Sequence, residues 1–276
     1  MSLQNRVIAF VGSGVMGEAM IKGLLAKRLV DPDCIITADP HQERGKELVE
    51  RYGVRFTTDN GEAVQQADVV VLSIKPQVMD KVLPGIHNRL KFEALVLSIA
   101  AGVPTARIVE GAGNQNVVRA MPNTPGQIGE GMTVWVATPQ VNGQQRQWAE
   151  LILGALGETL YATDERFMDM ATALNGSGPS YVFLLMEALI DAGVHMGFSR
   201  QDSQKLVQQT MLGSVKYAIE SGLHPAELRN QVTSPGGTSA AALYQLEKGG
   251  VRTTISQAVW AAYKRSVELG GSKDMS

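Results

Sequence analysis

Short apolar runs recur through the first half of the chain. Each run is brief, rich in β-branched residues and nearly continuous in apolar character, which is typical of strands buried on both faces of a parallel sheet. Helical stretches such as Glu18–Arg28 and Gln42–Tyr52 lie between several of them. This alternation predicts a doubly wound α/β domain. The runs are Arg6–Val11, Cys34–Ala38, Asp68–Ile74, Ala94–Ile99, Asn116–Met121 and Met132–Ala137.

The pattern changes after about Tyr161, where strand-like runs stop and long helical patterns begin. The helix expected over Pro179–Met196 is apolar nearly all round, so it must be buried. Either it lies at the centre of its own bundle or a second copy of the chain covers it, and we expect dimerisation. The predicted domains are therefore residues 1–162 and an all-α dimerisation domain over residues 163–276. The other long helical patterns are Glu165–Leu174, Arg200–Ser221 and Arg252–Leu269.

Composition is that of an ordinary globular protein. The chain has 276 residues, of which 44% are hydrophobic and 19% charged, and this is ample for a sizeable core. The formal net charge of −2 gives no general attraction for nucleic acid or an anionic membrane, so neither is expected as a partner. One cysteine, Cys34, excludes an intrachain disulfide and fits a reducing compartment. No signal-peptide pattern and no run of roughly 20 apolar residues is present, so we expect a cytoplasmic location.

A glycine-rich segment follows the first apolar run and opens the first helical stretch. The pattern G-x-G-x-x-G in this context predicts a dinucleotide-binding, Rossmann-like domain. The first glycine allows a tight turn, the second lets the pyrophosphate approach the backbone, and the third lets helix and strand pack closely. The alternative is another nucleotide fold with no redox role. The expected cofactor-binding residues here are Gly12, Ser13, Gly14, Val15, Met16 and Gly17.

Two further positions invite a choice between cofactor binding and helix capping. Asp39 ends the second apolar run, where an acid commonly holds the ribose hydroxyls and favours NAD. It could equally be a helix N-cap before Pro40. His41 and Arg44 follow closely and could neutralise a 2′-phosphate, so NADPH and NADH both remain open as cofactors. Asn60 is either a helix N-cap or an adenosine contact.

The ends of later strands complete the predicted cofactor site, because ligands of open α/β sheets lie beyond the carboxyl ends of the strands. Small residues there would admit a nicotinamide ring. Lys75 could act as a catalytic acid, but a surface lysine at a strand end is commoner. Asn123, within Met121–Pro125, is expected in the wall of the site; the alternative is a rigid turn with a possible cis bond. The other expected residues are Ser73, Ile74, Pro76, Ile99, Ala100 and Ala101.

The segment Ser234-Pro235-Gly236-Gly237-Thr238-Ser239 precedes a helical pattern over Thr238–Glu247. Its two glycines leave backbone amides free, and the amides at a helix start, with the positive end of the dipole, suit a carboxylate. The hydroxyls of Thr238 and Ser239 would lie beside that anion. The alternative is a capped turn between two helices. The four histidines show no metal-ligand spacing, so no metal site is expected.

Taken together, these segments resemble the pyrroline-5-carboxylate reductase family over nearly the whole chain. The resemblance implies reduction of L-1-pyrroline-5-carboxylate to L-proline by NADPH or NADH, the final step of proline biosynthesis. It also implies a helical domain that interlocks with its mate in a homodimer, often assembled as a pentamer of dimers, a decamer. The matching segments are Gly12–Gly17, Ser73–Pro76, Met121–Pro125, Asn175–Pro179 and Val232–Ser239, continued by Leu246-Glu247 and Gly249-Gly250.

The resemblance also implies roles for particular residues. The loop matching Ser234–Ser239 binds the proline carboxylate, and a hydroxyl at the position of Ser239, next to Thr238, faces the imine nitrogen. These two residues are the expected catalytic pair. Ser239 stands where the family has threonine, so it keeps the donor and loses a methyl group. An acid matching Glu165 lies near the substrate, and a residue matching Asn60 contacts the adenosine side. Gln231 replaces an asparagine found near the cofactor in some members.

Two other functions are compatible with part of the pattern. A β-hydroxyacid dehydrogenase or imine reductase usually needs a catalytic lysine or another proton donor on the long interdomain helix, and residues 176–196 contain no lysine. A sensor or scaffold that binds NAD(P)H without turnover would not need the segment Ser234–Ser239. A protonated cyclic imine is already electrophilic, so its reduction needs positioning and little acid–base machinery.

Overall fold

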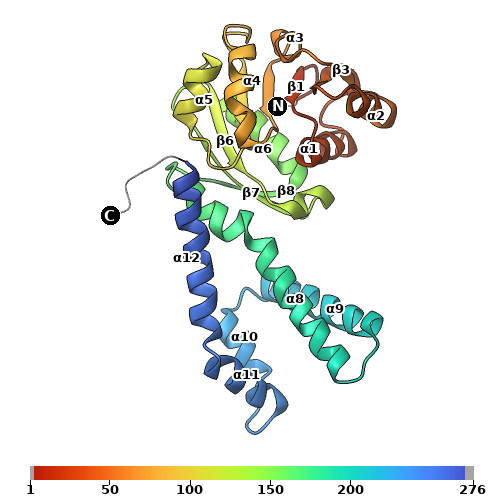
Figure 1. Cartoon of the computed structure of the whole chain (residues 1–276), viewed down its shortest axis with the longest axis vertical. Helices are drawn as coiled ribbons and strands as arrows, with labels where there is room; N and C mark the ends of the chain where they lie inside the picture. The colour runs from red at the N-terminus through yellow and green to blue at the C-terminus, as the bar shows by residue number, and fades with distance from the viewer. Residues whose placement is uncertain (1–2, 271–276) are drawn as a thin grey trace. The chain divides into compact units, whose positions relative to one another are not determined.

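The computed structural model describes residues 3–270, which form two compact units. Within that range the first unit comprises residues 3–178 and 262–270, and the second is Pro179–Ala261 (Figure 1). The first unit therefore continues past the boundary predicted after residue 162. The division into functional domains 1–162 and 163–276 stays a prediction.

An eight-stranded sheet with the order β3-β2-β1-β4-β5-β6-β7-β8 organises the first unit. Neighbouring strands are parallel except β6 and β7, which are antiparallel, so the expected parallel sheet is in fact mixed. All six predicted strands are present. The edge strands β3 and β8 were not predicted because none of their residues is buried and neither strand carries an apolar run. The strands are β1 (Ile8–Val11), β2 (Ile35–Ala38), β3 (Arg55–Thr57), β4 (Val69–Leu72), β5 (Leu95–Ser98), β6 (Val117–Met121), β7 (Gly131–Ala137) and β8 (Gly157–Tyr161).

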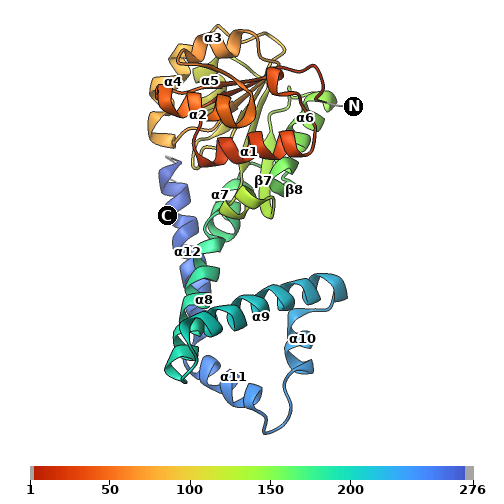
Figure 2. The ribbon, with the colours of Figure 1, turned by 90° about the vertical axis from the view of Figure 1, so that its right-hand side faces the viewer.

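Helices cover both faces of this sheet, as the two views show (Figures 1 and 2). Strand β1 illustrates how: Ile8 and Phe10 pack with residues of α1 and α6, whereas Ala9 and Val11 pack with residues of α3, α4 and α5. Both faces of each central strand are thus buried, which explains their continuous apolar character. The helices are α1 (Val15–Ala26), α2 (Gln42–Tyr52), α3 (Asn60–Gln65), α4 (Met79–Ile86), α5 (Thr105–Ala112), α6 (Gly143–Leu153) and α7 (Phe167–Ala171).

Short helical turns fill several connections of the first unit. Four are 3₁₀ turns, and the fifth, η5, is a π-helical turn that continues α7; such turns commonly mark functional positions. They are η1 (Pro32–Cys34), η2 (Pro76–Val78), η3 (Thr124–Ile128), η4 (Gly154–Leu156) and η5 (Thr172–Gly176).

The second unit is entirely helical, as the sequence predicted. Ser199 caps α9 by accepting a hydrogen bond from the amide of Asp202, and Gly222 ends the same helix in the left-handed conformation at φ 63°. Pro225 occupies the first position of α10, where its missing N–H costs nothing. The helices are α8 (Gly178–His195), α9 (Arg200–Ser221), α10 (Pro225–Gln231), α11 (Thr238–Lys248) and the first part of α12 (Val251–Leu269).

This helical unit has no apolar core of its own. No hydrophobic side chain between Pro179 and Ala261, a segment that the structure describes throughout, belongs to the buried set of the chain. Figure 2 shows α9, α10 and α11 following one another without closing into a bundle. Helix α8 therefore does not lie at the centre of a bundle within its own chain, and its apolar surface remains uncovered. None of the described helices is both long enough and apolar enough to cross a bilayer.

Candidate active site

The glycine-rich loop lies between β1 and α1, and two of its glycines are required by close packing. Gly12 has φ +90°, and a Cβ there would lie 2.5 Å from Ile74 Cγ2 and 2.8 Å from the Ser73 carbonyl oxygen. A Cβ on Gly17 would lie 2.8 Å from Ser73 Oγ. At Gly14, by contrast, a Cβ would meet no heavy atom within 4 Å. The backbone at Gly14, the N-cap of α1, is thus open to a ligand.

Unused hydrogen-bond donors gather at this opening. The first intrahelical bond of α1 runs from the Glu18 amide to the Gly14 carbonyl oxygen at 2.9 Å, so the amides between them have no acceptor in the helix. The Ser13 hydroxyl is buried and has no hydrogen-bond partner among the described residues. Buried polar groups are nearly always paired in native proteins. The loop therefore fits a pyrophosphate, whose oxygens would accept from these donors.

Strands β4 and β5 bring the other expected cofactor residues to the same edge of the sheet. The Ser73 hydroxyl donates to the Gly12 carbonyl oxygen at 2.6 Å and so ties the end of β4 to the glycine-rich loop. Lys75 is exposed and precedes η2, whose first residue is Pro76. Ala100, just beyond β5, is buried. The strand order reverses between β1 and β4, and this switch point is where α/β sheets bind ligands.

Asp39, at the end of β2, contacts the glycine-rich loop directly. Its Oδ2 accepts from the Ser13 amide at 3.0 Å, and its Oδ1 accepts from the His41 amide at 3.0 Å. Burial raises the pKa of the Asp39 carboxyl, but hydrogen bonds from His41 and Ser13 outweigh it and leave that pKa below its ordinary value. The capping alternative is wrong, because α2 begins at Gln42 with His41 as its N-cap residue. The ribose role stays a prediction, and the fixed anionic carboxylate supports it.

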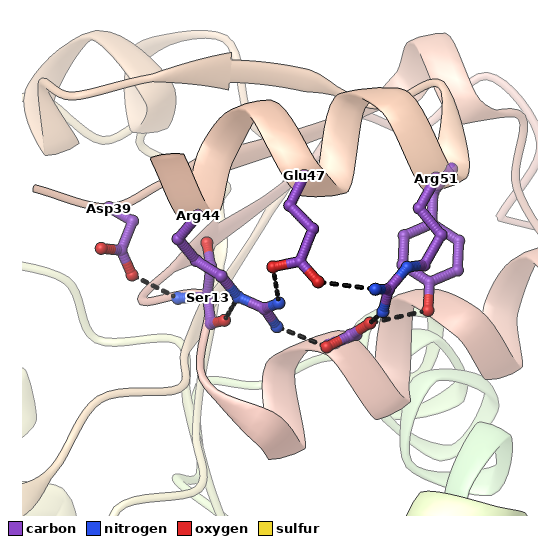
Figure 3. A network of polar contacts seen from close by, with 7 residues as sticks. Ser13, Asp39, Arg44, Glu47 and Arg51 are labelled. Carbon is purple, nitrogen blue, oxygen red and sulfur yellow. Dashed lines mark hydrogen bonds and ion pairs between the residues drawn. The ribbon is translucent and has the colours of Figure 1, made fainter. Parts of the chain in front are cut away.

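Arg44 connects this carboxylate region to an ion-pair network on α1 and α2 (Figure 3). Its Nε donates to the Ser13 carbonyl oxygen at 2.8 Å, and its terminal nitrogens pair with Glu47 and Glu18. Arg51 pairs with the same two glutamates. The sequence pointed to Arg44 as a nearby cation but gave no sign of these long-range partners.

Asn60 is not the helix N-cap, contrary to one of its two interpretations. It is the first residue of α3, and the N-cap is Asp59, whose Oδ1 accepts from the Gly61 amide at 2.8 Å. The neighbouring aspartate takes the capping position, and aspartate and asparagine are both common helix caps. The adenosine contact at Asn60 remains a prediction.

Asn123 joins the end of β6 to the π-helical turn. Its Nδ2 donates to Asn175 Oδ1 at 2.8 Å, and its Oδ1 accepts from the Met132 amide at 2.9 Å. Asn175 Nδ2 in turn donates to the carbonyl oxygens of Met121 and Met132. No peptide bond in the described residues is cis. Both asparagines therefore brace the segment that was expected to form a wall beside the nicotinamide, and that wall role stays a prediction.

Glu165 lies in a polar cluster with residues that the sequence did not suggest. Its carboxylate accepts from the amide of Thr105 at 2.8 Å and from the buried Arg119 at 2.9 Å. Burial raises the pKa of Glu165, but the Thr105 and Arg119 hydrogen bonds lower it below the ordinary value. Arg119 also lies 3.7 Å from Asp169, which accepts from the Ser266 hydroxyl. Glu165 thus caps α5, where Pro104 offers no side-chain cap.

The predicted carboxylate loop opens α11 in the second unit. Gly236 has φ +69°, and the Gly237 amide donates to the Ser234 carbonyl oxygen at 3.0 Å, closing a tight turn. Helix α11 then starts at Thr238, and its N-cap residue is Gly237. No side chain caps the helix, so the alternative of a capped turn is wrong. The first intrahelical bond runs from Ala241 to Gly237, so the amides of Thr238 and Ser239 remain open. The turn therefore leaves backbone donors open at the start of α11, and both the anion site and its ligand stay predictions.

Comparison with known proteins identifies the family of this chain. Residues 165–269 match the family model described as pyrroline-5-carboxylate reductase dimerisation. Residues 7–102 match the model described as NADP oxidoreductase, coenzyme F420-dependent. A pyrroline-5-carboxylate reductase from Synechocystis is 43% identical over 98% of this chain and 99% of its own length. The chain belongs to the pyrroline-5-carboxylate reductase family.

Solved structures of the same family support this membership. A pyrroline-5-carboxylate reductase from Coxiella burnetii has a TM-score of 0.90 and 36% identity, covering 96% of this chain and 98% of its own. The Plasmodium falciparum enzyme, solved with NADP bound, has a TM-score of 0.87 and 32% identity, with the same two coverages.

Membership confirms several predictions made from the sequence. The family resemblance is confirmed, as is the fold of a dinucleotide-binding domain followed by a helical domain. The class of enzyme, an oxidoreductase, is confirmed, and so is the use of a nicotinamide dinucleotide as cofactor. The expected function is confirmed at the level of the family. The match over residues 165–269 assigns that part of the chain to the dimerisation region of the family, consistent with an oligomer.

Proposed function

We propose that this chain reduces L-1-pyrroline-5-carboxylate to L-proline with NADPH or NADH, in the cytoplasm, as the final step of proline biosynthesis. The observation that carries the proposal is the uncapped start of α11, where two open amides stand beside the hydroxyls of Thr238 and Ser239. A chain that only bound a dinucleotide would have no need of a second anion site. The open glycine-rich loop supplies the cofactor half of the reaction.

Residues of the glycine-rich loop and of the turn before α11 have different roles in this reaction. The glycine-rich loop would hold the pyrophosphate of a reduced nicotinamide dinucleotide, which would supply the hydride. The turn from Ser234 to Gly237, with the first amides of α11, holds the substrate carboxylate. The Ser239 hydroxyl hydrogen-bonds the ring nitrogen, and Thr238 supports the carboxylate beside it. Hydride adds to C5 of the C=N bond, whose π electrons pass to nitrogen, and the nitrogen keeps its proton. No general acid is required for this step.

Glu165 has a supporting role in this proposal. Both of its carboxylate oxygens already accept hydrogen bonds, from Thr105 and Arg119. It therefore contributes a fixed negative charge near the substrate and does not transfer a proton. Asn123 likewise acts through the segment that it braces with Asn175.

The proposed reaction is tested by following NADPH and NADH oxidation with purified protein. We expect oxidation only when pyrroline-5-carboxylate is present, with L-proline as the product. The keto form of a β-hydroxyacid and a reaction without substrate serve as controls. Absence of any rate above background with both cofactors, in a sample shown to be folded by circular dichroism, would contradict the proposed function. Oxidation with the hydroxyacid's keto form alone would favour the dehydrogenase alternative.

We further propose that the chain forms a homodimer, assembled into a decamer. Helix α8 exposes Phe183, Leu184, Leu185 and Leu189, and its unit lacks a core. The first unit also carries an apolar groove of about 470 Å³, lined by residues of β7, β8, α7 and η5. Surfaces of this kind are rarely left open in soluble proteins, and a second copy of the chain is the occupant that a dimerisation region supplies.

Light scattering tests the assembly. The unmodified protein is expected to have at least the mass of two chains at micromolar concentration. Leu184→Lys, which puts a charge on the apolar face of α8, should lower that mass. Phe92→Lys makes the same kind of change at an exposed position of the first unit and should not. A fully active protein with the mass of one chain would refute the dimer.

A further inference from the structure

NADPH differs from NADH by one phosphate on the adenosine ribose, which carries close to two negative charges near neutral pH. A protein that accepts this group usually offers an arginine near the end of β2, whereas an acid at that place holds the ribose hydroxyls. This chain has both: Asp39 ends the strand and Arg44 lies on the following helix. Which cofactor binds better therefore depends on whether the Arg44 charge is available.

Every nitrogen of the Arg44 guanidinium is already engaged. Its Nε donates to the Ser13 carbonyl oxygen at 2.8 Å, its Nη1 donates to Glu47 Oε2 at 2.7 Å, and its Nη2 donates to Glu18 Oε2. The Arg44 and Glu18 side chains are only 24% and 19% exposed. Solvent therefore screens this pair less than an ordinary surface salt bridge. Each guanidinium nitrogen holds one partner, and Nη1 and Nη2 each keep a second N–H.

Glu18 is the residue that links the network, because it pairs with both arginines. It lies on α1, directly after the glycine-rich loop, and its Oε1 accepts from Arg51 Nη1 at 2.5 Å and from the Tyr52 hydroxyl at 2.8 Å. Burial raises the pKa of Glu18, but the hydrogen bonds from Arg44, Tyr52 and Arg51 outweigh it, and the pKa falls below its ordinary value. Glu18 is therefore ionised at neutral pH and holds Arg44 from the side of α1.

The charges of this region leave no surplus cation for a phosphate. Figure 3 labels two arginines, Arg44 and Arg51, and the acids Glu47 and Asp39. The third carboxylate of the network is that of Glu18, which pairs with both arginines. Among the guanidinium and carboxylate groups alone, two positive charges against three negative charges leave one negative unit. The His41 ring, whose Nδ1 lies 3.0 Å from Asp39 Oδ1, is the other group beside that carboxylate. A 2′-phosphate approaching Asp39 would meet like charge, whereas neutral ribose hydroxyls could donate to the carboxylate.

We infer that this chain binds NADH in preference to NADPH, and that Glu18 is a specificity-determining residue because it keeps the Arg44 charge neutralised. The inference rests on the proposed cofactor site at the glycine-rich loop. Asp39 would contact the ribose hydroxyls directly. Glu18 lies outside the ribose site and acts through its ion pair with Arg44, which keeps that side chain from pairing with a phosphate. Removal of the Glu18 charge should then admit NADPH without any change at Asp39.

The test is a direct fluorescence titration of NADH and of NADPH, in the absence of substrate, at fixed ionic strength. We expect the unmodified protein to bind NADH more tightly. Glu18→Gln keeps the size of the side chain and should raise the NADPH-to-NADH affinity ratio by roughly fivefold, the factor that corresponds to about 1 kcal/mol. The same substitution combined with Arg44→Met should lose this gain, because the released cation is then missing.

Glu50→Gln is the matched control. Glu50 is an exposed residue of α2, so this variant changes the net charge of the chain by the same amount. An equal shift of the affinity ratio in Glu50→Gln would overturn the inference, since only overall charge would then matter. Tighter NADPH binding by the unmodified protein would also overturn it. Binding of neither cofactor would instead overturn the proposed function, and circular dichroism of each variant would identify misfolding as the cause of any loss.

Discussion

Replacement of Arg119 by methionine is expected to lower the free energy of unfolding by about 3–5 kcal/mol, the usual cost of removing one partner of a buried ion pair. Arg119 is on β6, and its side chain is 5% exposed. Its loss would leave the carboxylates of Glu165 and Asp169 facing each other without a cation between them. Chemical denaturation at one fixed protein concentration measures the effect, since oligomer stability depends on concentration.

The loss should depend on pH in a defined direction. Burial raises the pKa of Glu165, whereas the hydrogen bonds from Thr105 and Arg119 lower it. The hydrogen bonds outweigh burial, so the pKa in the folded protein lies below the ordinary 4.5. A depressed folded pKa stabilises the protein fully above the unfolded value, and this contribution disappears as pH falls through the folded pKa. The difference between the unmodified protein and Arg119→Met should therefore be full near neutral pH and shrink below about pH 4.5.

Arg166→Met provides the control for this prediction. Arg166 also pairs with a carboxylate, that of Asp164, but its side chain is 86% exposed. Solvent screens an exposed pair, so its contribution is small and this variant should unfold almost as the unmodified protein does. Similar losses in the two variants, or a loss in Arg119→Met that does not change with pH, would show that the ion pair of Arg119 with Glu165 is not the source of the lost stability.

The central strands could be predicted from the sequence because burial on both faces produces a continuous apolar run. The same logic fails for β8, whose alternating exposure gives no such run, and for the direction of β7, which depends on pairing with β6 rather than on its own residues. The apolar pattern along one strand indicates only whether that strand is buried. It carries no information on which neighbour a strand pairs with.

The glycine-rich loop and the turn before α11 could be predicted because their conformation is encoded by adjacent residues. The partners of Glu165 could not, because Thr105 and Arg119 come from distant positions on α5 and β6. Arg119 lies among apolar residues of β6, and in the sequence a charged residue there suggests a break in the strand. In the structure it is the buried cation that pairs with Glu165 and Asp169. The Glu18–Arg44 pair was missed for the same reason, since α1 and α2 are brought together only by the fold.

Replacement of Ser239 by alanine is expected to reduce turnover on the imine by roughly ten- to a hundredfold, equivalent to about 1–3 kcal/mol for one lost positioned hydrogen bond. Ser239 is the second residue of α11, next to the uncapped helix start. In the proposed function its hydroxyl contacts the ring nitrogen and orients C5 for hydride addition. Affinity for NADH and NADPH should change little, because the glycine-rich loop belongs to the other compact unit.

Two companion variants separate chemistry from stability at this turn. Ser239→Thr keeps the hydroxyl and should retain activity, since the group proposed to contact the ring nitrogen is still present. Thr238→Ala removes the neighbouring hydroxyl, which is expected to affect carboxylate binding or the stability of α11 more than the orientation of the imine. Steady-state kinetics of the three variants, alongside cofactor titrations, provide the measurement. If Thr238→Ala loses turnover and Ser239→Ala remains active, the two roles are assigned the wrong way round. The Thr238 hydroxyl would then contact the ring nitrogen, and the Ser239 hydroxyl would contact the carboxylate.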